Sequence, residues 1–447
     1  MTEKQPPLAA GLPLLGNVLD MAQETRAFLT AQYQQHGPVF RVRALNQKFT
    51  VLAGPEANQF MTKESRNYFS SQEFWRGEDE EMGAARSLIS MDGADHARFR
   101  KVQQRGYSKS VINDNLDRVV AITRAELAEW GIGKTIPGLY GIQRIITEQL
   151  GQLAANYSPR EYLDDMITFV RTMLLATVTR QRPRLLLYTP AYRRAKARAM
   201  ELAAKVVAAH ENADDTAIQR TPDLIDDLLA FAREDPDFLP ERDLMPAILG
   251  PFVAGLDTVS STMAFMLYAL LKHPHILAQA TAEADQLFAE GIPTPSMLRD
   301  VDVLHRVTLE TLRMYPIAPA ITRTVTAPFE FAGYTIPTGA QVIIATTVPH
   351  YLPEFYPNPD VFDIDRYLPE RKEHRQPGAF APFGLGHHTC LGAGFAEVEI
   401  IVTMATMLNA VQLEMVPQNY ALKIDPAPTP SPDKAFQVQV VAQRRRL

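Results

Sequence analysis

The single cysteine of this chain constrains its fold and chemistry more than any other residue. Cys390 is the one cysteine among 447 residues, so no disulfide can form within the chain. This cysteine usage fits a cytoplasmic protein. A lone cysteine is usually an inert small core residue, so the residues around Cys390 decide whether it carries chemistry.

The overall composition is that of a globular protein with a large core. Hydrophobic residues make up 46% and charged residues 21% of the chain. A net charge of −6 offers no basic footprint for phosphate groups, so we expect no nucleic-acid partner. The first residues carry no apolar run behind a basic start, which predicts neither a signal peptide nor a membrane anchor. We expect a monomer in the cytoplasm.

One apolar segment, residues 245–271, is long enough to span a bilayer and contains no Lys or Arg. Its centre carries Asp257, Thr258 and three further hydroxyl side chains. An aspartate in the middle of a membrane is costly. We therefore interpret this segment as a buried helix in the core.

Periodicity predicts a mainly helical chain with a small β part. No segment resembles a linker, so we expect a single domain over residues 1–447, with residues 1–20 as an extended arm rich in Pro and Gly. Strands are expected at 39–42 and 49–52, around a turn at Asn46, then at 329–345 and near the C-terminus. Helices are expected at 112–130, 160–180, 190–211, 243–272, 300–315 and from Cys390 to about Leu408.

The glycines near Cys390 favour a reactive thiolate over an inert thiol. Gly384 and Gly386 let the backbone turn tightly around the sulfur and bring N–H groups close to it. A helix N-terminus is expected next, and its partial positive charge stabilises a thiolate, the form that binds a metal. Zinc is disfavoured, because no second cysteine or histidine pair stands at zinc spacing. A catalytic Cys–His pair would leave the glycines unexplained.

This segment resembles the haem-binding loop of the cytochrome P450 superfamily. The residues in register are Phe383, Gly384, Gly386, His388, Cys390 and Gly392. The resemblance implies haem b with Cys390 as the axial thiolate on iron, Phe383 packed near the sulfur and His388 reaching a propionate. It also implies the P450 fold, with a long central helix over the haem and the Cys loop on the proximal side. Glu397 departs from the pattern, because a basic residue is common there.

A second motif, Glu310-x-x-Arg313, places opposite charges on one helix face. By itself it is typical of a surface ion pair worth about 0–1 kcal/mol. In the P450 superfamily the same spacing is a buried pair joined by a downstream arginine, and Arg366 matches that third member. The resemblance therefore implies a structural cluster that helps to retain haem. Ile364 replaces the proline that is usual there.

A third motif, residues 254–258, lies inside the apolar helix and contains Gly255 and the pair Asp257–Thr258. Gly255 is expected to open space beside the helix, and Pro251 to kink or loosen it, because proline cannot donate a backbone hydrogen bond. An inert pair satisfied by backbone carbonyls is the structural alternative. The resemblance implies instead an acid–alcohol pair beside the O₂ site, in which Thr258 steadies dioxygen and Asp257 helps to deliver protons.

Basic residues complete the expected cofactor site. The resemblance assigns His96 and Arg100, which share one helix face, to the haem propionates. Arg323 stands in the place of another propionate-binding arginine. A second basic stripe, which includes Arg98 and Arg105, would suit an acidic electron donor.

Other cofactor-binding motifs are missing from the sequence. Residues 131–135, Gly-Ile-Gly-Lys-Thr, echo a phosphate-binding loop, but Ala128 stands where its first glycine is needed. A dinucleotide fingerprint fails at Thr389, which stands in place of the third glycine. We therefore expect no flavin or nicotinamide domain on this chain. Electrons would come from a separate protein of ferredoxin or flavodoxin type.

Together the motifs predict a haem–thiolate monooxygenase. It would insert one oxygen atom of O₂ into an apolar small molecule, by hydroxylation or epoxidation. Two alternatives stay open: a haem–thiolate enzyme that uses peroxide or rearranges an oxygenated substrate, and a non-enzymatic haem sensor or carrier. A nucleotide hydrolase ranks far behind these.

The expected substrate pocket is apolar. Its residues come from the central helix and from the segment after Tyr315: Phe252, Val253, Leu256, Val259, Ile317, Ala318, Ala320 and Ile321. Residues 74–88 are expected to form part of a lid. Fatty acids, terpenoids, steroids and polyketides all suit such a pocket, so the substrate class stays open.

Overall fold

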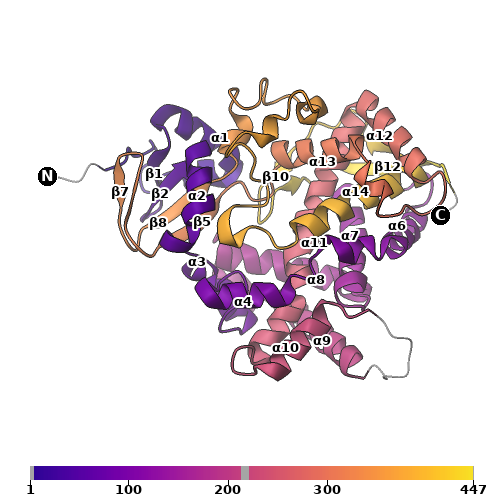
Figure 1. Cartoon of the computed structure of the whole chain (residues 1–447), viewed down its shortest axis with the longest axis horizontal. Helices are drawn as coiled ribbons and strands as arrows, with labels where there is room; N and C mark the ends of the chain where they lie inside the picture. Colours follow the sequence, from indigo (N-terminus) through magenta and orange to yellow (C-terminus); the bar gives the residue numbers. More distant parts are fainter. Residues whose placement is uncertain (1–4, 213–220, 446–447) are drawn as a thin grey trace. The chain divides into compact units, whose positions relative to one another are not determined.

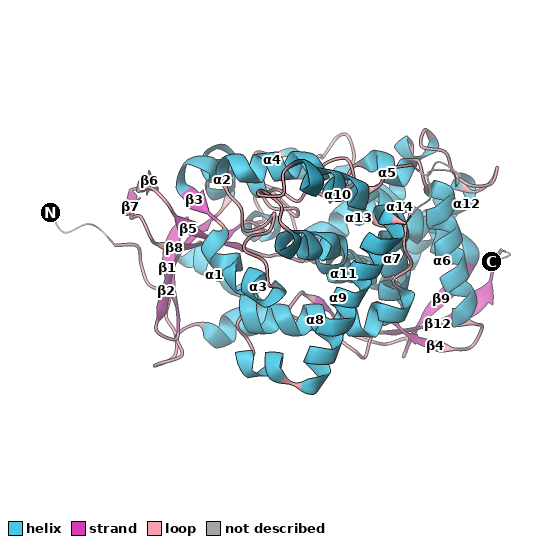
Figure 2. Ribbon diagram, turned by 90° about the horizontal axis from the view of Figure 1, so that it is seen from below, coloured by secondary structure: helices cyan, strands magenta, loops and turns pink. Residues whose placement is uncertain are grey.

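The computed structural model describes residues 5–212 and 221–445. They form two compact units, each made of several chain segments. The first unit comprises the described residues of Met1–Gly77, Leu88–Ala97 and Leu309–Cys390. The second comprises those of Glu78–Ser87, Arg98–Thr308 and Leu391–Leu447. Helices predominate and strands are few (Figure 2), which confirms the predicted mainly helical class.

A five-stranded sheet organises the first unit, with the strand order β1-β2-β8-β5-β3; Figure 1 labels β1, β2, β8 and β5. β1 and β2 form the expected hairpin, with Val39 opposite Leu52. β8 adds to β2 in parallel, although about 290 residues separate the paired positions Val51 and Ile343. The elements of this unit are α1 (Val18–His36), β1 (Val39–Ala44), β2 (Gln47–Ala53), α2 (Pro55–Tyr68), β3 (Phe69–Ser70), β5 (Ile321–Val325), β6 (Phe329–Phe331), β7 (Tyr334–Ile336) and β8 (Gln341–Ala345).

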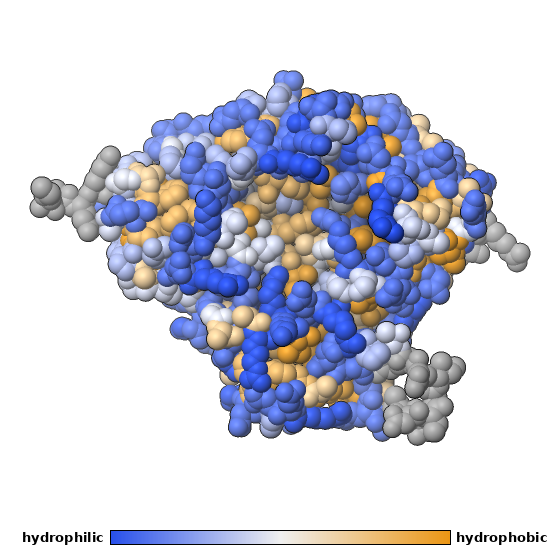
Figure 3. Space-filling model, in the orientation of Figure 1, coloured by the Kyte–Doolittle hydropathy of each residue, from blue (hydrophilic) through white to orange (hydrophobic). Residues whose placement is uncertain are grey.

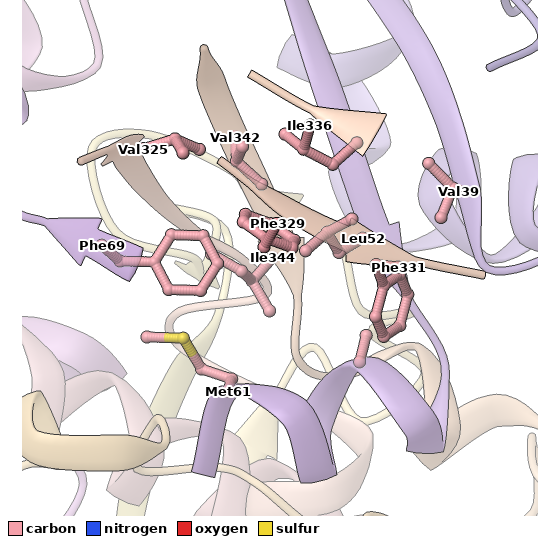
Figure 4. Packing of buried hydrophobic residues seen from close by; sticks show 11 residues of the cluster. Val39, Leu52, Met61, Phe69, Val325, Phe329, Phe331, Ile336, Val342 and Ile344 are labelled. Atoms are coloured by element: carbon pink, nitrogen blue, oxygen red, sulfur yellow. The ribbon is translucent and has the colours of Figure 1, made fainter. Parts of the chain in front are cut away.

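The two faces of this sheet are covered by different cores. Val342 and Ile344 of β8 point toward α2, where they pack with Met61 and with aromatic residues such as Phe329 (Figure 4). Ile343 points to the other face and belongs to a second cluster with Leu29 of α1 and Phe40. This division follows from the alternation of side chains along a strand. The sheet is therefore buried on both faces and gives the first unit a rigid base.

The second unit is mainly helical. Its elements are α5 (Lys109–Asn113), α6 (Leu116–Trp130), β4 (Thr135–Pro137), α7 (Gly138–Ala154), α8 (Leu163–Met173), α9 (Pro190–Glu211), α10 (Leu224–Glu234), α11 (Glu241–Lys272), α12 (Pro274–Leu287), α14 (Ala393–Ala410), β9 (Val411–Val416), β10 (Ile424–Asp425), β11 (Ser431–Pro432) and β12 (Gln437–Gln443). β12 joins β4 to β9 in a small sheet. Three more helices contain residues of both units: α3 (Gln72–Met82), α4 (Gly93–Gln103) and α13 (Val303–Met314).

The longest helix, α11, is the core of the second unit. It packs closely along α7, and Gly255 is one reason. A Cβ on Gly255 would approach a methyl group of Leu150 of α7 to 2.7 Å, so a larger residue would require the Leu150 side chain to shift. The space beside Gly255 is thus filled by Leu150 rather than open, contrary to the expectation for this glycine. Pro246 and Pro251 lie inside α11 without dividing it.

Several predicted helices differ from the observed ones at their ends. The stretch 112–130 is broken, because α5 ends at Asn113 and α6 begins at Leu116. The Asn115 side chain donates to the Val111 carbonyl at 2.8 Å and so competes with continued helical hydrogen bonding. The stretch 160–180 consists of a 3-10 turn, α8 and a π-helical turn at Leu174–Val178. The helix at 190–211 is confirmed as α9.

Two described segments, α11 and Gly386–Ala410, are long and apolar enough to cross a membrane by length and composition alone. Both are mostly buried within the protein, as core helices are. The expectation of a buried core helix at 245–271 is therefore confirmed.

Hydrophilic residues cover most of the face shown in Figure 3.

Candidate functional site

The loop that carries Cys390 is closed by its own backbone. The Cys390 N–H donates to the Phe383 carbonyl at 2.9 Å. Gly384 and Gly386 adopt left-handed φ values of 72° and 74°, and a Cβ on Gly386 would also collide with the Ser65 hydroxyl. Only glycine suits such a position. The Cys390 side chain is exposed, so its sulfur is accessible to a metal outside the loop.

Three histidines gather beside this loop in the first unit. His387 and His388 lie on the 3-10 turn Gly386–His388, and His96 comes from α4. The ring centroid of His388 lies 4.1 Å from the ring centroid of His96 and 4.3 Å from that of His387. We call His96, His387 and His388 the imidazole cluster. The sequence motifs indicate a cofactor role for His96 and His388, whereas nothing in them indicates one for His387.

Asp92 binds the imidazole cluster from one side. Its Oδ1 accepts from His388 Nε2 at 3.0 Å and lies 3.6 Å from His387 Nε2. Its Oδ2 accepts from the Ser70 hydroxyl at 2.6 Å and from the Ser71 N–H at 3.2 Å. Partial burial works to raise the pKa of Asp92, but the hydrogen bonds from the histidines and Ser70 hold it well below its usual range. The Asp92 side chain is therefore ionised at neutral pH.

Arg323 adds a buried cation to the same unit. Its Nη1 donates to the neighbouring Thr322 carbonyl at 2.8 Å, and its Nε has no partner among the described residues. Burial lowers the pKa of Arg323 to about 10, with Asp92 opposing this effect, so the guanidinium stays charged at neutral pH. An unsatisfied buried donor is costly. Arg323 and the imidazole cluster thus fit carboxylate groups such as haem propionates, and the exposed Cys390 thiol fits the iron.

Glu310, Arg313 and Arg366 form one buried cluster in the first unit. Two hydrogen bonds of 2.7 Å join the Glu310 carboxylate to the Arg313 guanidinium, and Arg366 Nε lies 3.2 Å from Glu310 Oε1. The Tyr367 hydroxyl donates to Glu310 at 2.8 Å. All three charged side chains are fully buried. The motif is thus a buried network and not a surface ion pair.

Glu373 is a fourth member of this network that the sequence did not predict. Glu373 accepts from Arg366 Nη1 at 2.9 Å, so two carboxylates face two guanidinium groups. Arg313 also donates to the His350 carbonyl at 2.8 Å, and Arg366 to the Pro357 carbonyl at 2.7 Å. These bonds tie α13 to the irregular chain that precedes the Cys390 loop. No local pattern around Glu373 indicated this role.

Asp257 is buried on α11 and is held by two polar side chains of the second unit. Gln143 of α7 donates to Oδ1 at 2.8 Å, and Arg171 of α8 lies 3.2 Å from Oδ2. Arg171 also donates to the Ala427 carbonyl at 2.9 Å. Burial raises the pKa of Asp257, and Arg171 and Gln143 offset this only in part. A carboxyl with a raised pKa is a better proton donor near neutral pH.

Thr258, the next residue, is exposed. Its hydroxyl donates to the Ala254 carbonyl at 2.7 Å, one turn back along α11. The backbone bond expected of an inert threonine is therefore present. Because the hydroxyl proton is engaged, the Oγ1 lone pairs remain available to accept a hydrogen bond from the exposed side.

The predicted pocket residues of α11 do not all lie on its exposed face. Phe252 and Leu256 are fully buried, and Val259 is nearly so. Ala254, which the sequence analysis did not assign, shares the exposed face with Thr258. The pocket role of the buried residues and of half-buried Val253 stays a prediction. The same holds for the first-unit residues Ile317, Ala318, Ala320 and Ile321, which are at least partly exposed.

The second basic stripe, which includes Arg98 and Arg105, is partly neutralised by acidic residues of the second unit. Arg98 pairs with Asp235 at 2.7 Å, and Arg105 binds Asp227 through two nitrogens. Half-buried Arg100, the predicted propionate ligand on α4, belongs to this unit too. Its role toward the cofactor stays a prediction.

The second unit shows the surroundings of two further sequence features, Glu397 and residues 131–135. Glu397, the acidic residue where a basic one is common, lies 3.5 Å from Lys109. The Gly-Ile-Gly-Lys-Thr stretch follows the end of α6, with Gly131 and Gly133 at φ 65° and 80°, and leads into β4. It is the helix end and turn that the sequence analysis favoured over a phosphate loop.

Comparison with known proteins gives one consistent family. The family model described as Cytochrome P450 matches residues 6–440. Cytochrome P450 4c21 of Blattella germanica is 32% identical over 54% of this chain and 48% of its own length. Pentalenene oxygenase of Streptomyces avermitilis is 26% identical over 91% of this chain and 90% of its own.

Solved structures agree in fold. The cytochrome P450DA heme domain superposes with a TM-score of 0.85 at 22% identity, covering 99% of both chains. A retinoic acid-bound cyanobacterial CYP120A1 gives 0.83 at 23% identity, covering 99% of this chain and 100% of the other. At these identities the likeness shows the fold alone.

Proposed function

Because this chain belongs to the cytochrome P450 family, we propose that it inserts one oxygen atom of O₂ into a C–H bond or an alkene of an apolar small molecule. The family and its oxygenase-named relatives make it a cytochrome P450 monooxygenase with a haem-iron cofactor. The type of haem, the substrate class and the electron donor are the parts that we propose.

We assign the cofactor as haem b. Cys390 would ligate the iron, and His96, His388, Arg323 and Arg100 would bind the propionates. Haem held by a thiolate supplies the binding of O₂ and the cleavage of its O–O bond. The unpartnered buried Nε of Arg323 supports this assignment, because a propionate would satisfy it.

The observation that carries the proposal is the contrast between Asp257 and Thr258. The Thr258 hydroxyl gives its proton to Ala254 and is exposed, so it can accept a hydrogen bond from a protonated oxygen or a water. Asp257 is buried beside it with a raised pKa, and can pass a proton to such a water. Peroxide-driven and rearranging enzymes, and a haem sensor, have no need of this pair.

An apolar substrate is supported by the half-buried side chains of Ile317 and Ile321 and by the exposed methyl of Ala254. The name of the relative pentalenene oxygenase agrees with an apolar molecule. Electrons would come from a ferredoxin or flavodoxin. We propose a monomer in the cytoplasm, and the single cysteine fits that compartment.

The test combines spectroscopy with turnover. The reduced, CO-bound protein should show the far red-shifted Soret band of thiolate-ligated haem, and the Cys390→Ala variant should lack it. A panel of terpenes, fatty acids and steroids is then screened for displacement of water from ferric iron. Hits are assayed with NADH, a ferredoxin reductase and a ferredoxin.

Oxygenated product that incorporates label from ¹⁸O₂ supports the proposal. Product formed with peroxide alone, and none with the electron-transfer chain, favours the peroxide-using alternative. Persistence of the CO band in folded Cys390→Ala protein would overturn the ligand assignment itself.

A further inference from the structure

The imidazole cluster contains more polar groups than two propionates require. His387 adds a third imidazole to His96 and His388, and the candidate ligand atoms of the three rings all lie within 4.8 Å of one another. His387 and His388 are almost completely buried, with side-chain exposures of 4% and 6%. Asp92 places a carboxylate against the same rings. A negative group next to a site for two negative groups needs a physical reason.

The hydrogen bonds supply that reason, because each histidine is held by a different set of acceptors. His387 is held through Nδ1, which lies 3.0 Å from the Ser65 hydroxyl, and its Nε2 lies 3.6 Å from Asp92, an ion-pair distance beyond hydrogen-bond range. His388 is fixed at Nε2 by Asp92 and by the Ser71 hydroxyl at 3.1 Å. No described partner is seen for its Nδ1. A carboxylate accepts only, so Asp92 takes the N–H at His388 Nε2 and fixes the plane of the ring; the far nitrogen, Nδ1, donates to a propionate in the doubly protonated imidazolium, the form that a neighbouring carboxylate favours.

Asp92 is itself rigidly held. The Ser70 hydroxyl and the Ser71 N–H anchor Oδ2, and the Ser71 hydroxyl is in turn bonded to the Ile89 carbonyl at 2.8 Å. These serines follow α2, so the carboxylate is anchored to the same part of the unit that contacts the Gly386 turn. The anchoring lets Asp92 determine ring orientation instead of following it.

We propose that Asp92 is a positioning residue for the haem propionates, acting through His387 and His388. It orients His388 directly and contacts His387 next to it, so that the rings of the imidazole cluster are held in a fixed arrangement beside Arg323. This inference rests on the proposed haem site and adds to it two residues, Asp92 and His387. Partners that orient a ligand-binding histidine commonly change affinity 10–100-fold when removed.

The test is the rate at which the ferric holoenzyme transfers haem to excess apomyoglobin. Asp92→Asn keeps the shape and removes the charge. Loss of a negative charge alone would strengthen propionate binding and slow the transfer, whereas loss of positioning accelerates it. We expect transfer about tenfold faster. The matched control Asp95→Asn makes the same charge change at an exposed position of α4 and should leave the rate unchanged.

A double-mutant cycle separates positioning from a general structural role. If Asp92 acts through the histidines, Asp92→Asn combined with His387→Asn should transfer haem no faster than the faster single variant. The ferric/ferrous midpoint potential should also rise in Asp92→Asn, because a negative charge near the haem is lost. A structural role alone would leave the potential unchanged and make the two rate effects additive.

Slower or unchanged haem transfer in Asp92→Asn, or an equal acceleration in Asp95→Asn, would overturn the proposal. If Asp92→Asn does not fold, His387→Asn alone decides, since it should accelerate transfer several-fold. The CO-bound spectrum of each variant separates this inference from the proposed function. A retained thiolate band leaves the haem–thiolate assignment standing when the positioning role fails, whereas wild-type protein without haem would end both.

Discussion

Replacement of Arg313 by Met should be one of the most destabilising single changes in this protein. The substitution keeps much of the side-chain length and removes the guanidinium that binds Glu310 twice at 2.7 Å. It leaves Arg366 as the one described charged partner of Glu310, and Arg366 is shared with Glu373, so the buried charge of Glu310 is only partly compensated. Breaking a buried pair from one side costs about 3–5 kcal/mol. The figure includes the loss of the hydrogen bond from Arg313 to the His350 carbonyl, since a bond of this kind contributes about 1.5–3 kcal/mol.

Arg371→Met is the matched control. Arg371 also binds Glu373, at 2.6 Å, and Asp363, at 2.8 Å, but a third of its side chain is exposed. Solvent screening limits such a pair to about 0–1 kcal/mol. Urea unfolding followed by tryptophan fluorescence gives both free-energy changes under the same conditions. Equal losses in the two variants, or a loss below about 1 kcal/mol for Arg313→Met, would refute the argument from burial.

Three further outcomes follow from the structure. Thr258→Ala should leave the fold and haem spectrum intact but divert electrons to peroxide, measured as product and peroxide formed per NADH consumed; unchanged coupling on a good substrate would make the pair structural. Burial raises the pKa of Glu399 to about 8, with no described partner for either oxygen. The folded state therefore keeps a proton that the unfolded state releases above its ordinary pKa, so stability falls as pH rises from about 4.5 to 8. Between pH 5 and pH 7 the wild type should lose about 2.5 kcal/mol more than Glu399→Gln in urea titrations; parallel pH profiles would contradict this. Gly386→Ala should reduce haem content far more than Gly384→Ala, because both have positive φ but only a Cβ at Gly386 collides with Ser65; equal haem content would contradict the steric argument.

The Cys390 loop was predictable from sequence because its geometry is local. Gly384 and Gly386 stand where φ is positive, and the closing hydrogen bond spans only seven residues, from Cys390 to Phe383. Backbone preferences of this kind act over a few residues. The hairpin of β1 and β2 and the long helices α9 and α11 were predictable for the same reason, since periodicity and turn residues are local signals.

Long-range pairing was not predictable in this way. Nothing in residues 341–345 indicates that β8 adds to β2 in parallel, or that Ile321–Val325 lies between β8 and β3. Strand neighbours depend on which apolar faces must be buried together, and that choice is made by the whole core. The break between α5 and α6 was likewise missed, because a helical pattern continues across Asn115.

The sequence by itself determined which residue types this protein has for its chemistry: one thiol between glycines, an acid beside an alcohol, and a Glu-x-x-Arg pair. Only the tertiary structure decided how each is used. Asp257 is buried against Gln143 and Arg171 while its neighbour Thr258 is exposed. Asp92 meets His387 and His388, nearly 300 residues away in the chain. Charge and hydrogen-bond partners depend on distance in space, and the sequence records only distance along the chain.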